Sequence, residues 1–462
     1  MNYLIVSAAL WCLLTVTTSM AQKQSIAHFS DLDYETEGLL ETYDSYVSDL
    51  PEDLQINKND ESNAIEETDA THQTQVSPAA RSLQDFAFDI FNSIEGLKPN
   101  QDNTVISPLS IYSALSMLKQ GLSGNSLTQV DDVINRHSAS DADVSRMHEA
   151  IFSKQARQLL RHASRVYFDN SIKLRKSYKK SLKRLNFAQA RKTDFGRNAE
   201  KSRVKMNKYV KNRTKKLIRD FVPEGGVSSA TKVYLLNALY LKAKWNFRFS
   251  STKPRRFRVN AQETISVPTM TAKYSICTNQ EDKVLNAKIT VLALGDDLSM
   301  IIAMPKQPGN FSSFYDDEHA QMKKKMSRLF NKIWPAEENG ERMLDVCDLA
   351  LPKFKISHQT DLVENLMNMG IIDVFDASVA DFSRMSKRSA ENLHLGDVRH
   401  KSVLDVNEDG VEGAGASGVD VAWKSPQTVR VKIDKPFLFA IRHDKTGAIL
   451  FLGKVTRPIS DV

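Results

Sequence analysis

The stretch ATKVYLLNALYLKAKW, residues 230–245, is a nearly continuous apolar run with Asn237 at its middle. Val, Leu and Tyr dominate it, and this composition is typical of a β-strand. We therefore expect a strand here, with one amide side chain set among apolar neighbours.

Helical patterns come before this strand and further strand patterns come after it. SLQDFAFDIFNSI (82–94) repeats apolar residues at helical spacing, and ISPLSIYSALSMLKQGLSG (106–124) predicts a helix that starts near Ser107, has Pro108 at its first position and ends at Gly121. β-type runs occupy 265–270, 289–294, 298–305, 344–356, 429–433, 437–443 and 448–455. This order predicts the α+β class.

The first 80 residues form two segments that differ from the rest. Residues 1–21 are an apolar run that ends in Ser19-Met20-Ala21, which predicts a cleaved signal peptide and a secreted, extracellular protein without a membrane span. Residues 22–80 hold 14 acidic residues against Lys23 and Lys58, so we expect an acidic, disordered extension. The folded domain is expected over 81–462.

Cysteines and glycosylation sequons agree with secretion. Cys277 and Cys347 remain after loss of the signal peptide, and their spacing leaves open whether they pair. Asn212 and Asn310 each begin an N-x-Ser/Thr sequon and are candidate N-glycosylation sites.

Five motifs, in this order, resemble the signature stretches of the serpin family of serine protease inhibitors. They are NTVISPLSIYSALSMLKQG (103–121), VYLLNALYLKAKWNFRF (233–249), LALPKFKI (349–356), VRHKSVLDVNEDGVEGAGASG (398–418) and PFLFAIRHDKTGAILFLGKVTRP (436–458). The resemblance implies three β-sheets, eight to nine helices and an exposed reactive-centre loop, here about 410–432. It also implies a suicide inhibitor whose cleaved loop inserts into the main β-sheet and traps the protease.

The loop composition suits such insertion, because residues 410–425 contain small side chains and no proline. The hinge that the resemblance implies comprises Glu408, Gly410, Val411, Gly413, Ala414, Gly415 and Ala416. Val411 departs from the family pattern, in which Thr or Ser is usual. Two other interpretations are weaker: a calcium loop from Asp405 would need Glu where Ala416 stands, and a flexible linker would not continue into strand-like VDVAW.

The family offset places the scissile bond at Lys424-Ser425. Lys424 is the only basic residue between Lys401 and Arg430, so we expect a trypsin-like serine protease as partner. Cleavage after Trp423 by a chymotrypsin-like enzyme is the alternative. We find no G-x-S-x-G, H-E-x-x-H or phosphate loop, and we expect neither an enzyme nor a metal site.

Matching family positions also imply residues that control opening of the sheet. Ser107, Ser110, Asn237 and His400 are expected to form a polar cluster beneath it, for which ordinary buried hydrogen bonding is the alternative role. Trp245 is expected where the loop enters, with Glu408 pairing with Lys353 at the same end.

Positive charge is concentrated in residues 154–219, which hold 23 Lys or Arg against Asp169, Asp194 and Glu200. Solvated faces normally mix both signs, so we expect binding of a sulfated glycosaminoglycan, with heparin-like chains as activators and no nucleic acid as partner. The candidate residues are Lys154, Arg157, Arg161 and Arg165 on one helical face, and Lys176, Lys180 and Lys183 on another.

The acidic extension contains Tyr34, Tyr43 and Tyr46 within DLDYETEGLLETYDSYVSDLPED, a context that suits tyrosine sulfation. It resembles the acidic extension of a heparin-activated serpin, although a purely solvating tail is the other interpretation. The leading hypothesis is a secreted, monomeric inhibitor accelerated by polyanions. The alternative is a non-inhibitory serpin that acts as a glycosaminoglycan-bound carrier.

Overall fold

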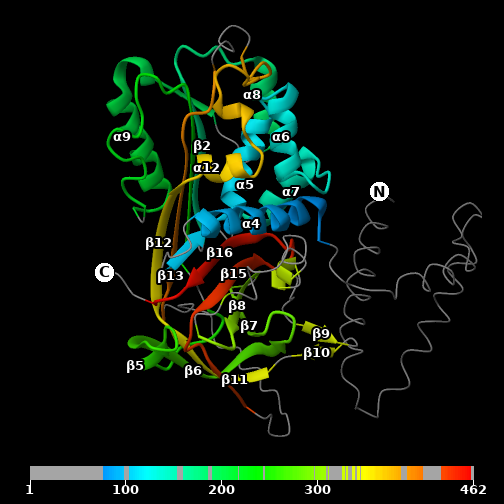
Figure 1. Cartoon of the computed structure of the whole chain (residues 1–462), viewed down its shortest axis with the longest axis vertical. Helices are drawn as coiled ribbons and strands as arrows, with labels where there is room; N and C mark the ends of the chain where they lie inside the picture. Colours follow the sequence, from blue (N-terminus) through cyan, green and yellow to red (C-terminus); the bar gives the residue numbers. More distant parts are fainter. Residues whose placement is uncertain are drawn as a thin grey trace, which may run out of the picture. The chain divides into compact units, whose positions relative to one another are not determined.

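The structure is a computed structural model that describes residues 76–458. The gaps are 98–102, 153–159, 186–189, 217, 243–244, 296, 309–310, 312–324, 328, 331–335, 339–340, 344, 387–392 and 409–427. The predicted signal peptide, residues 22–75 of the predicted acidic extension and its tyrosines therefore lie outside the described residues. The predicted end of the extension at residue 80 is too late, because α4 already begins at Pro78, and Ala79 and Ala80 are buried in the core. Figure 1 shows the arrangement of the helices and strands.

Helices make up most of the first half of the described chain. They are α4 (Pro78–Leu97), α5 (Pro108–Lys119), α6 (Gly124–Ile134), α7 (Asp141–Ile151), α8 (Lys176–Arg184) and α9 (Phe195–Arg213), followed later by α12 (Val363–Asn368) and the 3-10 turn η3 (Asp373–Phe375). The two predicted helices correspond to α4 and α5 and are confirmed.

The start of α5 follows the predicted capping pattern. Ser107 is the N-cap and accepts a hydrogen bond from the backbone N–H of Ser110 at 3.3 Å, with Pro108 next in the chain. The helix ends at Lys119, two residues before the predicted end at Gly121. A Cβ atom at Gly121 would lie 2.6 Å from Cε and 3.0 Å from Cβ of Met385 and 3.1 Å from the ring of Tyr178, so a larger residue here would require the Met385 side chain to move.

A five-stranded sheet runs along the left side of the coloured part of Figure 1. Its order is β12 (Phe354–Asp361), β13 (Val398–Val406), β4 (Val233–Lys242), β2 (Leu160–Asp169) and β3 (Ala190–Thr193). β12 pairs antiparallel with β13, and β2 pairs antiparallel with β4. β13 and β4 are parallel neighbours, with Val398 opposite Leu235 and Asp405 opposite Lys242.

Both faces of this sheet are covered, which explains the nearly continuous apolar run in β4. Leu235 and Leu239 join the main core beneath α5, whereas Tyr234, Leu236 and Tyr240 belong to a second apolar cluster with residues of α9. Successive strand residues point to opposite faces, so Asn237 points to the α5 side.

The second large sheet has nine strands and includes the long strand β6. The order is β1 (Asn103–Ile106), β16 (Ile449–Val455), β15 (Phe437–His443), β8 (Leu298–Pro305), β7 (Ala287–Leu294), β6 (Thr264–Asp282), β11 (Asp345–Pro352) and β14 (Val429–Lys432), with β5 (Ser251–Arg258) also on β6. β9 (Ala336–Glu338) and β10 (Glu341–Met343) form a separate two-stranded ribbon. Three sheets and mainly early helices confirm the α+β prediction.

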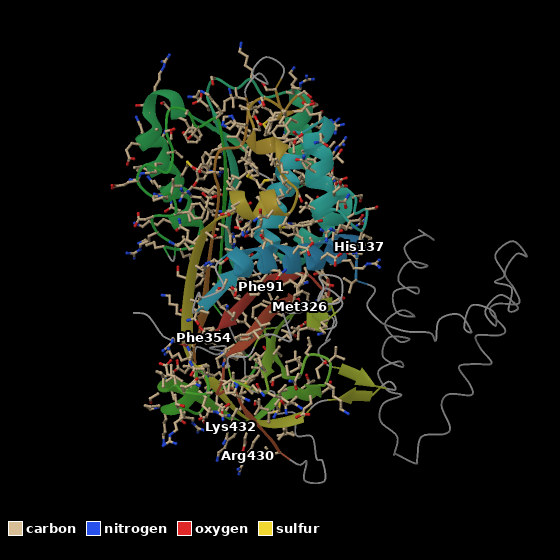
Figure 2. All side chains as sticks on the ribbon, in the orientation of Figure 1. Phe91, His137, Met326, Phe354, Arg430 and Lys432 are labelled. Carbon is tan, nitrogen blue, oxygen red and sulfur yellow. A yellow bond between two sulfur atoms is a disulfide. The ribbon has the colours of Figure 1, made fainter. Side chains whose placement is uncertain are left out.

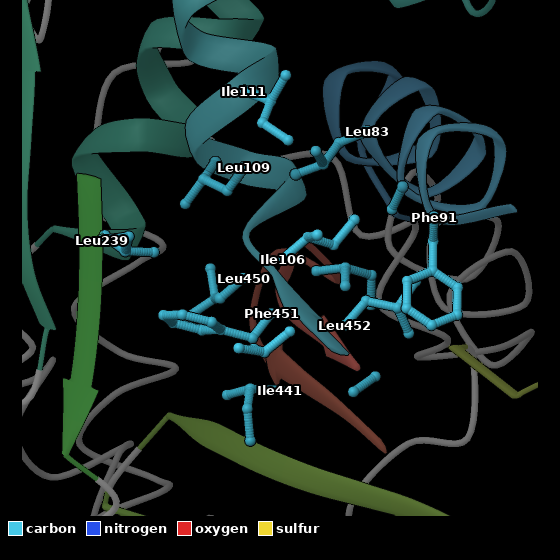
Figure 3. Close-up of a cluster of buried hydrophobic side chains, with 14 of the residues drawn as sticks. Leu83, Phe91, Ile106, Leu109, Ile111, Leu239, Ile441, Leu450, Phe451 and Leu452 are labelled. Carbon is cyan, nitrogen blue, oxygen red and sulfur yellow. The ribbon is translucent and has the colours of Figure 1, made fainter. Parts of the chain in front are cut away.

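Figure 3 shows the core where α4 and α5 meet β16. Leu83 and Phe91 of α4, Leu109 of α5, and Phe451 of β16 are all buried there. Leu239 of β4 reaches the same cluster, so the core joins the helices to both large sheets.

Candidate functional site: the junction between β13 and β4

A buried polar cluster lies beneath the parallel pair β13–β4. The amide Nδ2 of Asn237 donates to the backbone carbonyl of Ser110 in α5, and a second contact joins it to Oγ of Ser164 in β2 at 3.4 Å. Ser164 is directly opposite Asn237 in the β2–β4 register. Asn237 therefore connects β4 to its neighbouring strand and to the helix below.

His400 is the member of this cluster that belongs to β13. Its Nε2 accepts from the backbone N–H of Ser107 at 3.0 Å and lies 2.7 Å from Oγ of Ser402, while its Nδ1 lies 3.5 Å from Oγ of Ser110. Because a backbone N–H can only donate, Nε2 is unprotonated and the neutral ring carries its proton on Nδ1. Burial of the ring, with a smaller effect of His358, lowers the pKa of His400 to about 3.

A second group of contacts lies at the end where β13 leads into the loop. The indole Nε1 of Trp245 donates to the backbone carbonyl of Asn407 at 2.9 Å. Trp245 is fully buried, and its ring packs against Phe247 and Phe249 with centroid distances of 5.6 and 5.7 Å. The segment that leaves β13 is thus attached to the segment that follows β4.

Glu408 is the last residue described before the loop, and both of its carboxylate oxygens are engaged. Nζ of Lys353, between β11 and β12, donates to Oε2 at 2.7 Å, and Oγ1 of Thr252 in β5 donates to Oε1 at 2.6 Å. Burial acts to raise the pKa of Glu408, but these hydrogen bonds outweigh it and hold the pKa below its usual value. Glu408 therefore links the five-stranded sheet to β5.

The structure places the residues that the sequence analysis predicted to control opening of the sheet in two groups. We call the inner group the buried polar cluster and the outer group the loop-end cluster. The buried polar cluster comprises Ser107, Ser110, Ser164, Asn237, His400 and Ser402, and the loop-end cluster comprises Trp245, Thr252, Lys353, Asn407 and Glu408. Sequence reasoning did not single out Ser164, Ser402, Thr252 or Asn407 as members of these clusters.

The reactive bond and most of the hinge lie outside the described residues. These are Lys424, Ser425, Gly410, Val411, Gly413, Ala414, Gly415 and Ala416. Both sides of the loop are described. It begins after Glu408, and the chain returns in β14, which pairs parallel with β11 from Val429 opposite Cys347.

The basic residues do not all lie where the sequence placed them. Arg161 and Arg165 belong to strand β2, so the predicted single helical face over residues 154–165 is wrong there. The guanidinium of Arg165 lies 3.6 Å from the ring centroid of Tyr209, which makes it a packing residue. Lys154 and Arg157 lie outside the described residues.

The second predicted basic face does lie on a helix. Lys176, Lys180 and Lys183 are exposed on α8, while Tyr178 and Leu182 on its other side are buried. Asn212 is exposed near the end of α9, as a glycosylation site requires, whereas Asn310 lies outside the described residues.

The two cysteines left open by the sequence form a disulfide. Cys277 of β6 and Cys347 of β11 are both fully buried, and the bond joins neighbouring strands of the nine-stranded sheet. Cys347 is also opposite Val429, so the disulfide fixes the strand on which the returning loop pairs.

The family model for serpins, serine protease inhibitors, matches residues 81–458. The chain belongs to the serpin family. A serine protease inhibitor of Cyanea capillata is 32% identical over 392 residues, which is 82% of this chain and 98% of the relative. Mouse antithrombin-III is 29% identical over 394 residues, or 81% of this chain and 80% of the relative.

Solved structures agree with this assignment. Maspin superposes with a TM-score of 0.72 at 25% identity, over 82% of this chain and 99% of maspin. Uncleaved ovalbumin gives a TM-score of 0.69 at 26% identity, over 82% of this chain and all of ovalbumin.

Proposed function

We propose that this serpin is a secreted suicide inhibitor of a trypsin-like serine protease. A protease cleaves the loop after Lys424, and the freed segment then inserts between β13 and β4 while the enzyme remains attached to it. The chain supplies a substrate loop and a sheet that can open, and it performs no catalysis of its own.

The parallel pairing of β13 with β4 carries this proposal. The loop begins just beyond the end of β13, so a segment that turns back there would run antiparallel to both strands. It would enter at the loop-end cluster, where Trp245 and Glu408 hold the closed sheet together. It would then pass the buried polar cluster, whose contacts must exchange as the strands separate.

The disulfide supports secretion, because such bonds form and persist in oxidising compartments. Exposed Lys176, Lys180 and Lys183 on α8 support acceleration by a heparin-like chain. The acidic extension, which is similar in composition to that of heparin cofactor II, would then compete for the basic body and bind a protease surface after release. Sulfation of its tyrosines would strengthen this competition.

The test is to mix the purified protein with trypsin and measure a complex that survives denaturing electrophoresis. We expect a covalent complex with the wild type, none with Lys424→Ala, and a faster reaction with heparin. A complex that persists in Lys424→Ala and forms with chymotrypsin would move the bond to Trp423. Cleavage without a complex and without a gain in thermal stability would instead support the non-inhibitory carrier, for which Val411 is the sequence argument.

A further inference from the structure

The outer side of α9 carries a row of cations that belong to the basic segment 154–219 but that the sequence analysis did not name as candidate binding residues. Lys201, Lys205, Lys208 and Lys211 are exposed and follow one another at intervals of four, three and three residues. Residues at these intervals share one side of a helix. We call this row the α9 face. From Lys201 to Lys211 it spans about 15 Å at the usual rise per residue.

Negative charge does not offset this row. Glu200 is the single acidic residue of α9, and it already pairs with Arg203 at 2.7 Å. Within the described part of the chain, none of the four lysines forms an ion pair with a carboxylate. Cations in the last turn of a helix offset its dipole, but Lys201 and Lys205 lie too far from the C-terminus for that role.

The α9 face is held rigidly by the opposite side of the helix. Phe195, Met206 and Val210 are fully buried against the five-stranded sheet. Asn207 exchanges two hydrogen bonds with the backbone of Val222, at 2.8 and 2.9 Å, which fixes the helix against the returning chain. The spacing of the cations is therefore set before any ligand arrives.

Positive charge continues beyond the helix. Arg213, Lys215, Lys216 and Arg219 are all exposed, and the positive φ angles of 49° and 66° at Lys215 and Lys216 turn the chain there. Figure 2 shows nitrogen-tipped side chains along the outer side of α9, on the left of the view. A long row followed by a cluster suits a linear ligand better than a compact anion.

We propose that the α9 face binds a linear sulfated polysaccharide, independently of the cations on α8. Repelling lysines on a fixed helix gain most from a ligand with closely spaced permanent anions, which releases its condensed counterions on binding. A single-stranded nucleic acid would also need exposed aromatic rings on which its bases stack. α9 has two aromatic residues, and neither offers a free ring: Phe195 is buried and Tyr209 is covered by Arg165.

The experiment compares variants with equal charge loss for binding to a heparin oligosaccharide of defined length. The first variant is Lys201→Gln/Lys205→Gln/Lys208→Gln. The matched control is Lys253→Gln/Arg255→Gln/Arg256→Gln, which removes three exposed cations from β5. All proteins are treated to remove N-linked glycan, because Asn212 lies at the end of the same helix. Thermal unfolding checks that each variant is folded.

We expect the α9 variant to bind heparin at least about tenfold more weakly at 0.15 M salt, with the slope of log K against log salt reduced by about two to three. The β5 variant should change affinity by less than about threefold. Equal losses in both variants would mean diffuse attraction by net charge and would overturn the proposal, as would an unchanged α9 variant.

Two further ligands test the chemical class. Unsulfated hyaluronan should not bind measurably under the same conditions, and single-stranded DNA of matched charge should bind more weakly than heparin. Tighter binding of the DNA would overturn the choice of a polysaccharide.

This inference extends the part of the proposed function that concerns binding of a polyanion. The inference and the proposed function are tested by different experiments, so one can be wrong while the other holds. The binding assay requires no protease and no loop insertion, so it reports on the α9 face alone. A Lys176→Gln/Lys180→Gln/Lys183→Gln variant, assayed for heparin-accelerated inhibition, reports on α8.

Discussion

Nζ of Lys353 lies 2.7 Å from Oε2 of Glu408, so the residue before β12 holds the segment that leaves β13. The two side chains keep 37% and 34% of their surface exposed. An ion pair in that setting contributes little to global stability, and its effect is instead local. It opposes separation of the chain at the place where a new strand would enter.

A double-mutant cycle with Lys353→Gln and Glu408→Gln should give a coupling energy of about 0.5–1 kcal/mol at pH 7. Because the folded state holds the pKa of Glu408 below its usual 4.5, the coupling is present above that pH and is lost as pH falls below it. Chemical unfolding of the four proteins at pH 7 and at low pH measures it. Coupling that strengthens on acidification would contradict the ion-pair account.

His400 should make the protein sensitive to acid. Its pKa is about 3 when folded and 6.5 in the unfolded chain, so the unfolded state takes up a proton first as pH falls below 6.5. Stability is then lost at about 1.4 kcal/mol per pH unit between these values. We expect the free energy of unfolding of His400→Gln, measured from pH 7 to 4, to fall less steeply with decreasing pH than that of the wild type. The difference in slope should correspond to about one proton.

His148 offers an independent comparison for this effect. It is buried beside Ser113, at 2.7 Å from its Oγ, and burial lowers the pKa of His148 to about 3 as well. His148→Gln should reduce the pH slope of the free energy of unfolding by a similar amount. The double variant should reduce that slope by an amount that corresponds to about two protons. An unchanged slope in all three variants would show that other groups control acid unfolding.

Replacing Trp245 with Phe should ease opening of the sheet. Phe keeps a ring against Phe247 and Phe249 but loses the hydrogen bond to the Asn407 carbonyl, at a cost of about 1 kcal/mol. The measurement is the rate at which a synthetic peptide with the sequence of residues 411–424 enters the sheet. We expect a faster rate in Trp245→Phe, and Phe249→Leu is the control that disturbs packing alone. A slower rate in Trp245→Phe would be inconsistent with Trp245 holding the sheet closed.

The disulfide should stabilise the fold substantially. Cys277 and Cys347 are 70 residues apart, and closing a loop of that length stabilises a protein by about 4 kcal/mol in the chain-entropy account. Cys277→Ser/Cys347→Ser should lower the denaturant midpoint accordingly, and reducing agent should affect the wild type but not the variant. Equal midpoints for the variant and the oxidised wild type would contradict this estimate.

Much of the fold could be predicted because the patterns are local. The runs at 298–305 and 437–443 correspond residue for residue to β8 and β15. The error at Arg161 and Arg165 has a simple cause, since residues four apart share a face on a strand as well as on a helix. Periodicity alone could not decide between the two.

The site was only partly accessible to sequence reasoning. Ser164 and Ser402 are short polar residues without a motif. Ser164 becomes a partner of Asn237 only through strand register, whereas Ser402 contacts His400 two residues away on the same face of β13. Thr252 reaches Glu408 across 156 residues of sequence. Pairing of Cys277 with Cys347 likewise depends on the adjacency of β6 and β11, which spacing in the chain does not reveal.

The parallel contact between β13 and β4 also determines how many hydrogen-bond ladders the sheet can form at this position. The closed sheet has one ladder at this position, of the parallel kind that is slightly weaker per residue. A strand placed between the two, opposite in direction to both, would exchange that single ladder for two antiparallel ones. If the loop inserts as proposed, the closed form is a sheet that accepts one more strand, and how long it persists would depend on how slowly the two clusters let β13 and β4 separate.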